Sequence, residues 1–399
     1  MMSSNAYLKI KNSVLKNLNT LSLDKLDYKY SKNSDSSLFT TCFAVFVLDL
    51  FKELDEEKSD VKLQLSNYIN SFQCHKSGLF NPNNKLHHDH IRNTYQLTCF
   101  ALSALNILGQ KPNYKIQVIN NWIGKEYVES YLFKNGCHVG APGSGNKAMF
   151  QAIFLTNEYK NTGEKKYLDS MKYWFDFHER HKNQHGFFGN SKKNYWYKGL
   201  QNSFHQLLVY NYWGREYSKL NKVSEIIPLL QDSDGHFAPK VGGGSCEDYD
   251  AIYYLLTCLN TGVRVHKSDQ IIDRAITAIL KNQNKDGGFC ESRLSDHSVI
   301  KKIFLQLSHV MNSPNKEIFF LKLKKTAKYI FKTNDIKHTG WVAEGQRWNE
   351  STLWATWFRC LTLAEITSYR EPELASKYFN FHDFIGLGIP AKKNQISLN

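Results

Sequence analysis

The chain has 399 residues, of which 42% are apolar and 14% aromatic, and it carries a formal net charge of +14. A chain of this length and composition buries a sizeable core, which excludes a largely disordered protein. The lysines are scattered and form no basic block, so we expect no nucleic-acid partner, although a positive surface favours acidic substrates or anionic lipid heads.

The eight cysteines stand singly, without a C-x-x-C pair, which predicts neither a disulfide framework nor a structural zinc site. The N-terminus lacks an apolar core, and no apolar run reaches the length of a membrane span. We therefore expect a cytoplasmic protein that needs no cofactor. The sequence indicates no oligomeric state.

Three segments are predicted along the chain. Residues 1–36 are polar apart from one weak amphipathic stretch, and we treat them as a leader to the fold. A strongly apolar helix follows from Ser37 to about Leu54. We expect a single domain over residues 37–370 and a tail over residues 371–399.

Within that domain, glycine breaks recur at intervals of roughly 50 residues, which indicates internal repeats. The breaks lie at Gly78, Gly136, Gly186, Gly235, Gly287 and Gly340. Amphipathic segments precede the breaks, at 58–75, 115–134, 165–183, 219–232, 268–284 and 317–334. More uniformly apolar segments follow them, at 89–108, 146–160, 200–216, 247–260, 297–311 and 350–368.

This alternation predicts the fold. Segments with one polar face suit an outer shell, and uniformly apolar segments suit a buried inner barrel. We therefore predict an all-α protein, an (α/α)6 toroid of six helix-pair repeats, with an open solenoid as the alternative. The break glycines should lie in tight turns with positive φ.

A cluster of acids marks the most promising site. In GGGSCEDYDAIYYLLTCLN, residues 242–260, three glycines lead into Glu247, Asp248 and Asp250 at the start of a predicted inner helix. The helix terminus favours their negative charge, while mutual repulsion opposes ionising all three, so one of them can hold a proton at neutral pH. The alternative is a solvated helix cap.

Several strings resemble the repeats of known toroid enzymes. The stretch from Gly78 to Leu105, GLFNPNNKLHHDHIRNTYQLTCFALSAL, resembles the repeat of protein prenyltransferase beta subunits. QDSDGHF at 231–237 and QNKDGGF at 283–289 resemble the Gln-to-aromatic repeats of squalene and oxidosqualene cyclases, and CEDYDAIYYL at 246–255 resembles an altered acid motif of class II terpene cyclases. The resemblance spans about residues 60–368 and implies the toroid fold.

The catalytic motifs of these families are changed or missing. The acid motif keeps its carboxylates but not their spacing. The Asp-x-Cys pair through which prenyltransferases bind zinc occurs nowhere in the chain, so we predict no catalytic metal. HHDH at 87–90 offers histidines, but neighbouring side chains on a loop do not point one way.

If the inner helices all begin at one rim, their first turns bring further polar and aromatic side chains together there. For any one of these residues, helix capping or core packing is the alternative explanation. As catalytic residues we predict Asp248, Asp250, Glu247, His205 and Glu350. As substrate-binding residues we predict Asp89, His90, Asn146, Tyr95, Tyr253, Asp296, His297 and Trp354.

Three functions remain open. An isoprenoid-handling enzyme would use a protonated Asp248 or Asp250 and a ring-lined barrel that stabilises a carbocation. A carbohydrate-active hydrolase or lyase would pair one of these acids with Glu350. A binding scaffold would hold a ligand without turnover. The outer helix at 317–334, with lysines beside aromatic residues, is a candidate for peripheral contact with an anionic membrane.

Overall fold

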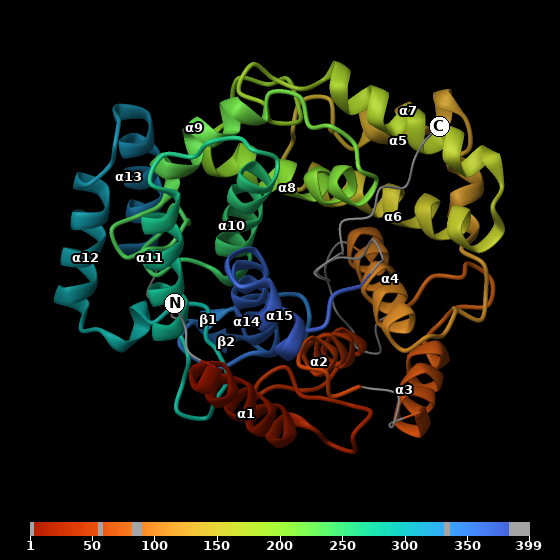
Figure 1. Ribbon diagram of the computed structural model, residues 1–399, viewed down its shortest axis with the longest axis horizontal. Helices are drawn as coiled ribbons and strands as arrows, with labels where there is room; N and C mark the ends of the chain where they lie inside the picture. The colour runs from red at the N-terminus through yellow and green to blue at the C-terminus, as the bar shows by residue number, and fades with distance from the viewer. Residues whose placement is uncertain (1–3, 55–58, 82–89, 331–335, 383–399) are drawn as a thin grey trace. The chain divides into compact units, whose positions relative to one another are not determined.

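The computed structural model describes residues 4–54, 59–81, 90–330 and 336–382 (Figure 1). Their regular structure is helical apart from strands β1 (Ile336–Lys337) and β2 (Gln346–Arg347), which pair antiparallel. The predicted all-α class is therefore confirmed. Within these ranges, no helix is long and apolar enough to cross a membrane.

The chain divides into two compact units, and each is described here by itself. The first comprises Met1–Glu53, Asn84–Leu86 and Ser224–Asn380. Its helices are α1 (Ser4–Leu21), α2 (Leu38–Leu50), α10 (Ser245–Asn260), α11 (Ser268–Lys281), η3 (Leu294–Asp296), α12 (Val299–Met311), α13 (Lys316–Ile330), α14 (Leu353–Arg370) and α15 (Pro372–Tyr378).

The second unit comprises Leu54–Asn83, His87–Val223 and Phe381–Asn399. Its helices are α3 (Ser59–Ser71), α4 (His90–Ile107), η2 (Gln117–Trp122), α5 (Lys125–Lys134), α6 (Ser144–Thr162), α7 (Lys165–Arg180) and α8 (Trp196–Tyr212). Helix α9 (Leu220–Leu230) spans the division between the units.

The predicted contrast between inner and outer helices holds in the first unit for α10, α14 and α11. Helices α10 and α14 pack against each other and are buried along most of their length. Helix α11 buries a single face, formed by Ile271, Ile272, Ala275, Ala278 and Ile279. Apolar side chains at helical spacing on one face are typical of an outer helix.

One hydrogen bond recurs at the glycine breaks. The backbone amide of the aromatic residue after the break donates to a side-chain oxygen in an inner helix, which ties the turn to that helix. The pairs are Phe80 with Thr98, Phe188 with Ser203, Phe237 with Asp248, and Phe289 with Thr356, at 2.8 to 3.0 Å. Asp248 therefore occupies a position where other repeats carry Ser or Thr.

The break glycines have positive φ, as predicted, with values of +71° at Gly78, +88° at Gly186, +91° at Gly235, +95° at Gly287 and +85° at Gly340. Close approach is a second reason for glycine. A Cβ on Gly235 would lie 2.5 Å from the Arg274 carbonyl oxygen of α11, the next outer helix.

Helix α1 lies against the Gly287 turn in the way that α11 lies against the Gly235 turn. A Cβ on Gly287 would lie 2.0 Å from the Ser13 carbonyl oxygen of α1. The Tyr7 hydroxyl forms a 2.6 Å hydrogen bond with Thr367 Oγ1 of α14. Residues 4–21 thus pack on the first unit as an outer helix does. The division of the chain into a leader, one toroid domain and a tail stays a prediction.

Helices α12 and α13 depart from the repeat pattern. Phe289 donates its amide to Thr356, 67 residues along the chain, so both helices lie between a break and the inner helix to which it is bonded. They pack chiefly on each other, at one edge of the first unit (Figure 1). The expectation that 297–311 forms a buried inner helix is wrong, because Ile300, Phe304, Leu307 and Met311 of α12 are exposed.

Candidate functional site

The acid cluster lies at the first two turns of α10, as the sequence predicts. Gly242 and Gly243 have positive φ, and Gly244 caps the helix in an extended conformation. A Cβ on Gly243 would come within 2.6 Å of the His236 ring, so the absence of a side chain lets the loop lie against that histidine. The glycines therefore bring the start of α10 next to the Gly235 turn.

Asp248 is a buried and fully partnered carboxylate. Its Oδ2 lies 2.7 Å from His236 Nδ1 and also accepts from Arg359 of α14, while Oδ1 accepts from the Phe237 amide. Burial alone would raise the pKa of Asp248, but His236, Arg359 and the hydrogen bonds together lower it. Asp248 is therefore ionised at neutral pH and acts as an anchor between helices.

Asp250, two residues further on, has a contrasting environment. Its side chain is buried, with 6% of the residue exposed, and among the described residues no hydrogen bond or ion pair reaches its carboxyl group. Burial, followed by the charges of Glu247 and Asp248, raises the pKa of Asp250 well above its ordinary value. This environment favours the protonated form of the Asp250 carboxyl group.

A second buried carboxylate lies beside the start of the helix. Glu291 accepts from the Ser245 amide at 2.7 Å and from Lys337 Nζ at 2.6 Å. Burial opposes its ionisation, yet Lys337, Lys240 and these hydrogen bonds lower the pKa of Glu291 to about 2. Like Asp248, Glu291 is held ionised by neighbouring cations.

Aromatic rings pack around the helix turns that carry these acids. The ring centroids of Tyr249 and Tyr253 are 5.8 Å apart, and Tyr249 lies 5.5 Å from Phe358 of α14. Trp354 lies 4.6 Å from Phe358. Tyr253 is only partly buried and follows Asp250 by three residues, a spacing that places two side chains on one helix face. The electron-rich ring of Tyr253 therefore lies on the same helix face as Asp250.

The other predicted site residues of the first unit lie away from Asp250 or in the core. Glu350 accepts from the Arg347 amide at 3.4 Å in the loop before α14. Asp296 is exposed and bonds Arg293 and Asn349, and His297 is half-buried beside it. Trp354 is buried and stacks on Trp341 at 5.0 Å.

Three predicted residues lie in the second unit. His205 Nδ1 is 3.0 Å from the Gln201 carbonyl oxygen, one turn back in α8. Asn146 is half-buried in the first turn of α6. Tyr95 packs edge-on against Trp122 and Phe154, and burial raises its pKa. Asp89 lies outside the described residues, as does the side chain of His90.

Sequence reasoning did not pick out the groups that set the charges of the acids, which are His236, Arg359, Glu291 and Lys337. Arg359 could have been recognised from the sequence, because it is the only charged residue in the inner-helix stretch LWATWFRCLTLA, residues 353–364. A charge within such a run is normally buried with a partner. No sequence signal identified Asp248 as that partner.

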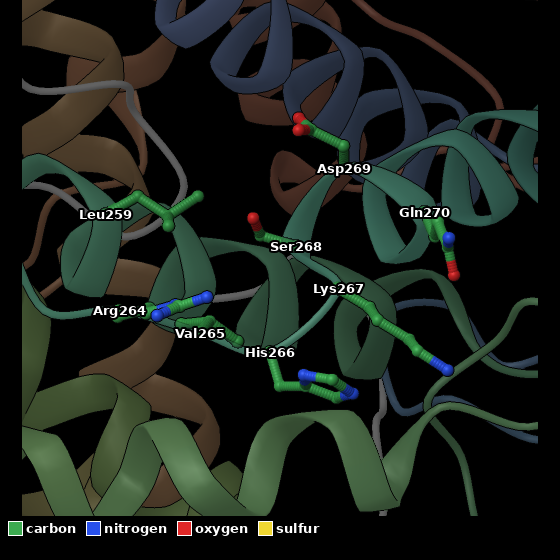
Figure 2. A pocket seen from close by; sticks show the side chains of 8 residues that line it. All are labelled: Leu259, Arg264, Val265, His266, Lys267, Ser268, Asp269 and Gln270. Carbon is green, nitrogen blue, oxygen red and sulfur yellow. The ribbon is translucent and has the colours of Figure 1, made fainter.

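A separate hollow of about 350 Å³ opens at the other end of α10 (Figure 2). It lies between Leu259 and the first turn of α11, and its lining includes Arg264 and Lys267 together with Asp269. Nine residues of helix, about 14 Å, separate Leu259 from Asp250. This hollow is therefore not part of the acid site.

In the ranges that the structure describes, no group of three or more His, Cys, Asp and Glu side chains could hold an ion. Residues 87–89 of the HHDH stretch lie outside those ranges. The prediction of no catalytic metal stays a prediction.

Comparison with known families identifies the class of protein. The sequence model of the prenyltransferase alpha-alpha toroid domain matches residues 13–149 and 96–298. Together these matches cover well over half of the chain. The chain therefore belongs to the prenyltransferase alpha-alpha toroid family, and the predicted toroid fold is confirmed.

Individual proteins are only distantly similar. The type II terpene cyclase MstE from Scytonema is 12% identical over 72% of this chain and 82% of its own, with a TM-score of 0.47. The unsaturated glucuronyl hydrolase from Bacillus sp. GL1 is 12% identical over 93% and 97%, with a TM-score of 0.48. The Candida albicans protein geranylgeranyltransferase-I is 13% identical over 97% and 96%, with a TM-score of 0.32.

A search among curated proteins found no match. The structural likenesses are too distant to bear on activity, and none of them assigns a role to a residue of this chain.

Proposed function

We propose that this protein is an enzyme that acts on an isoprenoid or lipid-linked substrate by acid catalysis, with Asp250 as the proton donor. The observation that carries the proposal is the state of Asp250: a buried carboxyl group without a partner among the described residues, with a raised pKa, in a family of isoprenoid-handling toroids. Such a group favours the neutral acid and so keeps a proton available for transfer to a substrate, as a general acid must.

In the proposed step, the O–H bond of Asp250 breaks as its proton forms a C–H bond with a substrate alkene. With an epoxide, the proton goes to oxygen and a C–O bond breaks. Either route leaves an Asp250 carboxylate and a carbocation, which a second alkene of the substrate attacks to close a ring. The last cation then loses a proton, the Asp250 carboxylate takes up a proton again, and the reaction is complete. In this proposal the ring of Tyr253 stabilises positive charge on the way.

The neighbouring groups have positioning roles in this proposal. Arg359 and His236 keep Asp248 ionised, and the fixed negative charge of Asp248 discourages ionisation of Asp250. The sequence hypothesis treated Asp248 and Asp250 as equivalent donors. With its oxygens bonded to Arg359, His236 and Phe237, Asp248 supports Asp250 rather than replacing it.

Carbohydrate chemistry is the second candidate, since paired carboxylates cleave glycosidic bonds. One observation favours it: Glu247 is partly exposed and precedes Asp250 by three residues on the same helix. In that case both acids are required, whereas the isoprenoid reaction needs only Asp250. A scaffold that binds without turnover needs neither.

The test is turnover on a panel of linear isoprenoids, each as alkene and as terminal epoxide, together with a panel of oligosaccharides. Cyclised isoprenoid product should fall by about a hundredfold or more in Asp250→Asn, the loss expected for a missing general acid. Glu247→Gln should stay within about threefold of the wild type. Glycan cleavage that requires both acids, or no turnover of either panel, would overturn the proposal.

The partner of the protein is thus proposed to be a small isoprenoid, or a glycan in the second candidate. With a lipid-linked substrate we further propose peripheral contact with an anionic membrane. The cytoplasmic location stays a prediction.

A further inference from the structure

Helices α12 and α13 form a hairpin inserted between Phe289 and the inner helix α14. The match to the toroid family ends at residue 298, one residue before α12 begins. The recurring hydrogen bond joins Phe289, which precedes the hairpin in the sequence, to Thr356, which follows it. The hairpin is therefore an addition to the repeat pattern, and packing of the inner helices does not explain it.

The outward face of this hairpin is apolar. Ile300, Phe304, Leu307 and Met311 are 82%, 70%, 50% and 72% exposed. Their spacing places them on one side of α12, in a stripe about 17 Å long. On α13, Phe320 and Leu323 are also exposed, at 64% and 41%. Large apolar side chains gathered in this way mark an interaction surface.

The side of α12 that faces the protein is partly polar. Gln306 and His309 are buried there, and Gln306 Oε1 accepts from Thr326 of α13 at 3.3 Å. His309 Nδ1 bonds Asp232, whose other oxygen lies 3.3 Å from Lys322 Nζ. This buried cluster, formed by α12, α13 and Asp232 in the turn after α9, holds the hairpin in place, so the apolar stripe is a fixed face.

Lysines border the stripe. Lys301 of α12 and Lys316, Lys324 and Lys325 of α13 are exposed. Helix α12 contains no acidic residue, and Glu317 is the single acid of α13. The sequence predicts that Lys322 faces the membrane with the other lysines of residues 317–334. That expectation is wrong, because Lys322 is buried against Asp232.

We infer that the α12–α13 hairpin docks the protein on an anionic lipid surface, with its apolar stripe in the acyl boundary and its lysines at the headgroups. Apolar residues flanked by lysines are what such a surface binds, through buried area and attraction to anionic lipid. A second copy is disfavoured, because a two-fold contact through this face would bring lysines of both copies together. The inference extends the membrane contact proposed above and is independent of the acid chemistry.

The experiment is co-sedimentation of the full chain with vesicles of phosphatidylcholine alone and of phosphatidylcholine with phosphatidylserine. We expect binding to the anionic vesicles, weakening as salt rises, and little binding to the neutral ones. Phe304→Glu with Met311→Glu should lower the bound fraction about tenfold or more, and Lys324→Glu with Lys325→Glu should do likewise. Leu23→Glu, at a site 55% exposed in the same unit, should bind as the wild type does.

Equal binding to both vesicles, no binding, or binding unchanged in both double variants would overturn the inference. A dimer in solution that Phe304→Glu disperses would assign the face to a second copy instead. Because vesicle binding is read without turnover, its failure leaves the acid proposal standing, and loss of turnover in Asp250→Asn leaves the membrane result unaffected.

Discussion

Asp248 and Asp250 are separated by one residue, yet their carboxyl groups have opposite surroundings. Two residues of α-helix turn the side-chain direction by about 200°. Asp248 therefore faces Arg359 and His236, whereas Asp250 has no partner among the described residues. The sequence indicated that one of the acids holds a proton. It could not say which, because Arg359 is 111 residues from Asp248 along the chain.

A first prediction separates these roles. Asp248→Asn should destabilise the protein by about 3–5 kcal/mol, because it leaves the buried Arg359 charge without its carboxylate. Asp250→Asn should be neutral or stabilising, since it removes a buried group that resists ionisation. Urea unfolding of both variants measures this. Equal effects would show that the two environments do not differ as described.

A double variant sharpens the comparison. Adding Arg359→Met to Asp248→Asn should recover most of the lost stability, because no unpaired charge then stays buried. The stability that Asp248 contributes is present above its unfolded-state pKa and is lost as the pH falls through its lowered folded-state pKa. Additive losses in the double variant would contradict the pairing.

At the scale of elements, periodicity predicted most helices and the conformations of the break glycines. It failed at α12, where an apolar segment of helical length was taken for an inner helix. Apolar side chains look alike in sequence whether they face a core or an external surface. The distinguishing fact is the hydrogen bond from Phe289 to Thr356, which joins residues too far apart for sequence reasoning to pair.

The break at Gly287 offers a test of how the repeats pack. Gly287→Ala should cost about 3 kcal/mol or more, from positive φ and from a Cβ only 2.0 Å from the Ser13 carbonyl oxygen. Gly262 is a matched control, with φ of +78° and nothing within 4 Å of the added Cβ. Gly262→Ala should cost about 1 kcal/mol, from φ alone. Equal melting temperatures in the two variants would mean that α1 does not pack on this turn.

At the scale of the whole molecule, the fold class followed from repeated glycine breaks, and the family match supports it. The candidate site could be predicted from the sequence only in part. A cluster of acids at a helix start is visible in sequence, but the pKa of each acid depends on burial and on charges brought from distant segments. The proposed chemistry therefore depends on one quantity that the sequence cannot supply, the protonation state of Asp250.

Global stability measured against pH tests that state without a substrate. The folded-state pKa of Asp250 is raised, so folding takes up a proton, and the associated stability is lost as the pH rises from about 4 to that folded-state pKa. The unfolding free energy of the wild type, relative to Asp250→Asn, should fall by about 1.4 kcal/mol per pH unit over this window. A relative free energy that stays flat, or rises, between pH values of about 4 and 7 would show that Asp250 is an ordinary ionised carboxylate, and would contradict its role as proton donor.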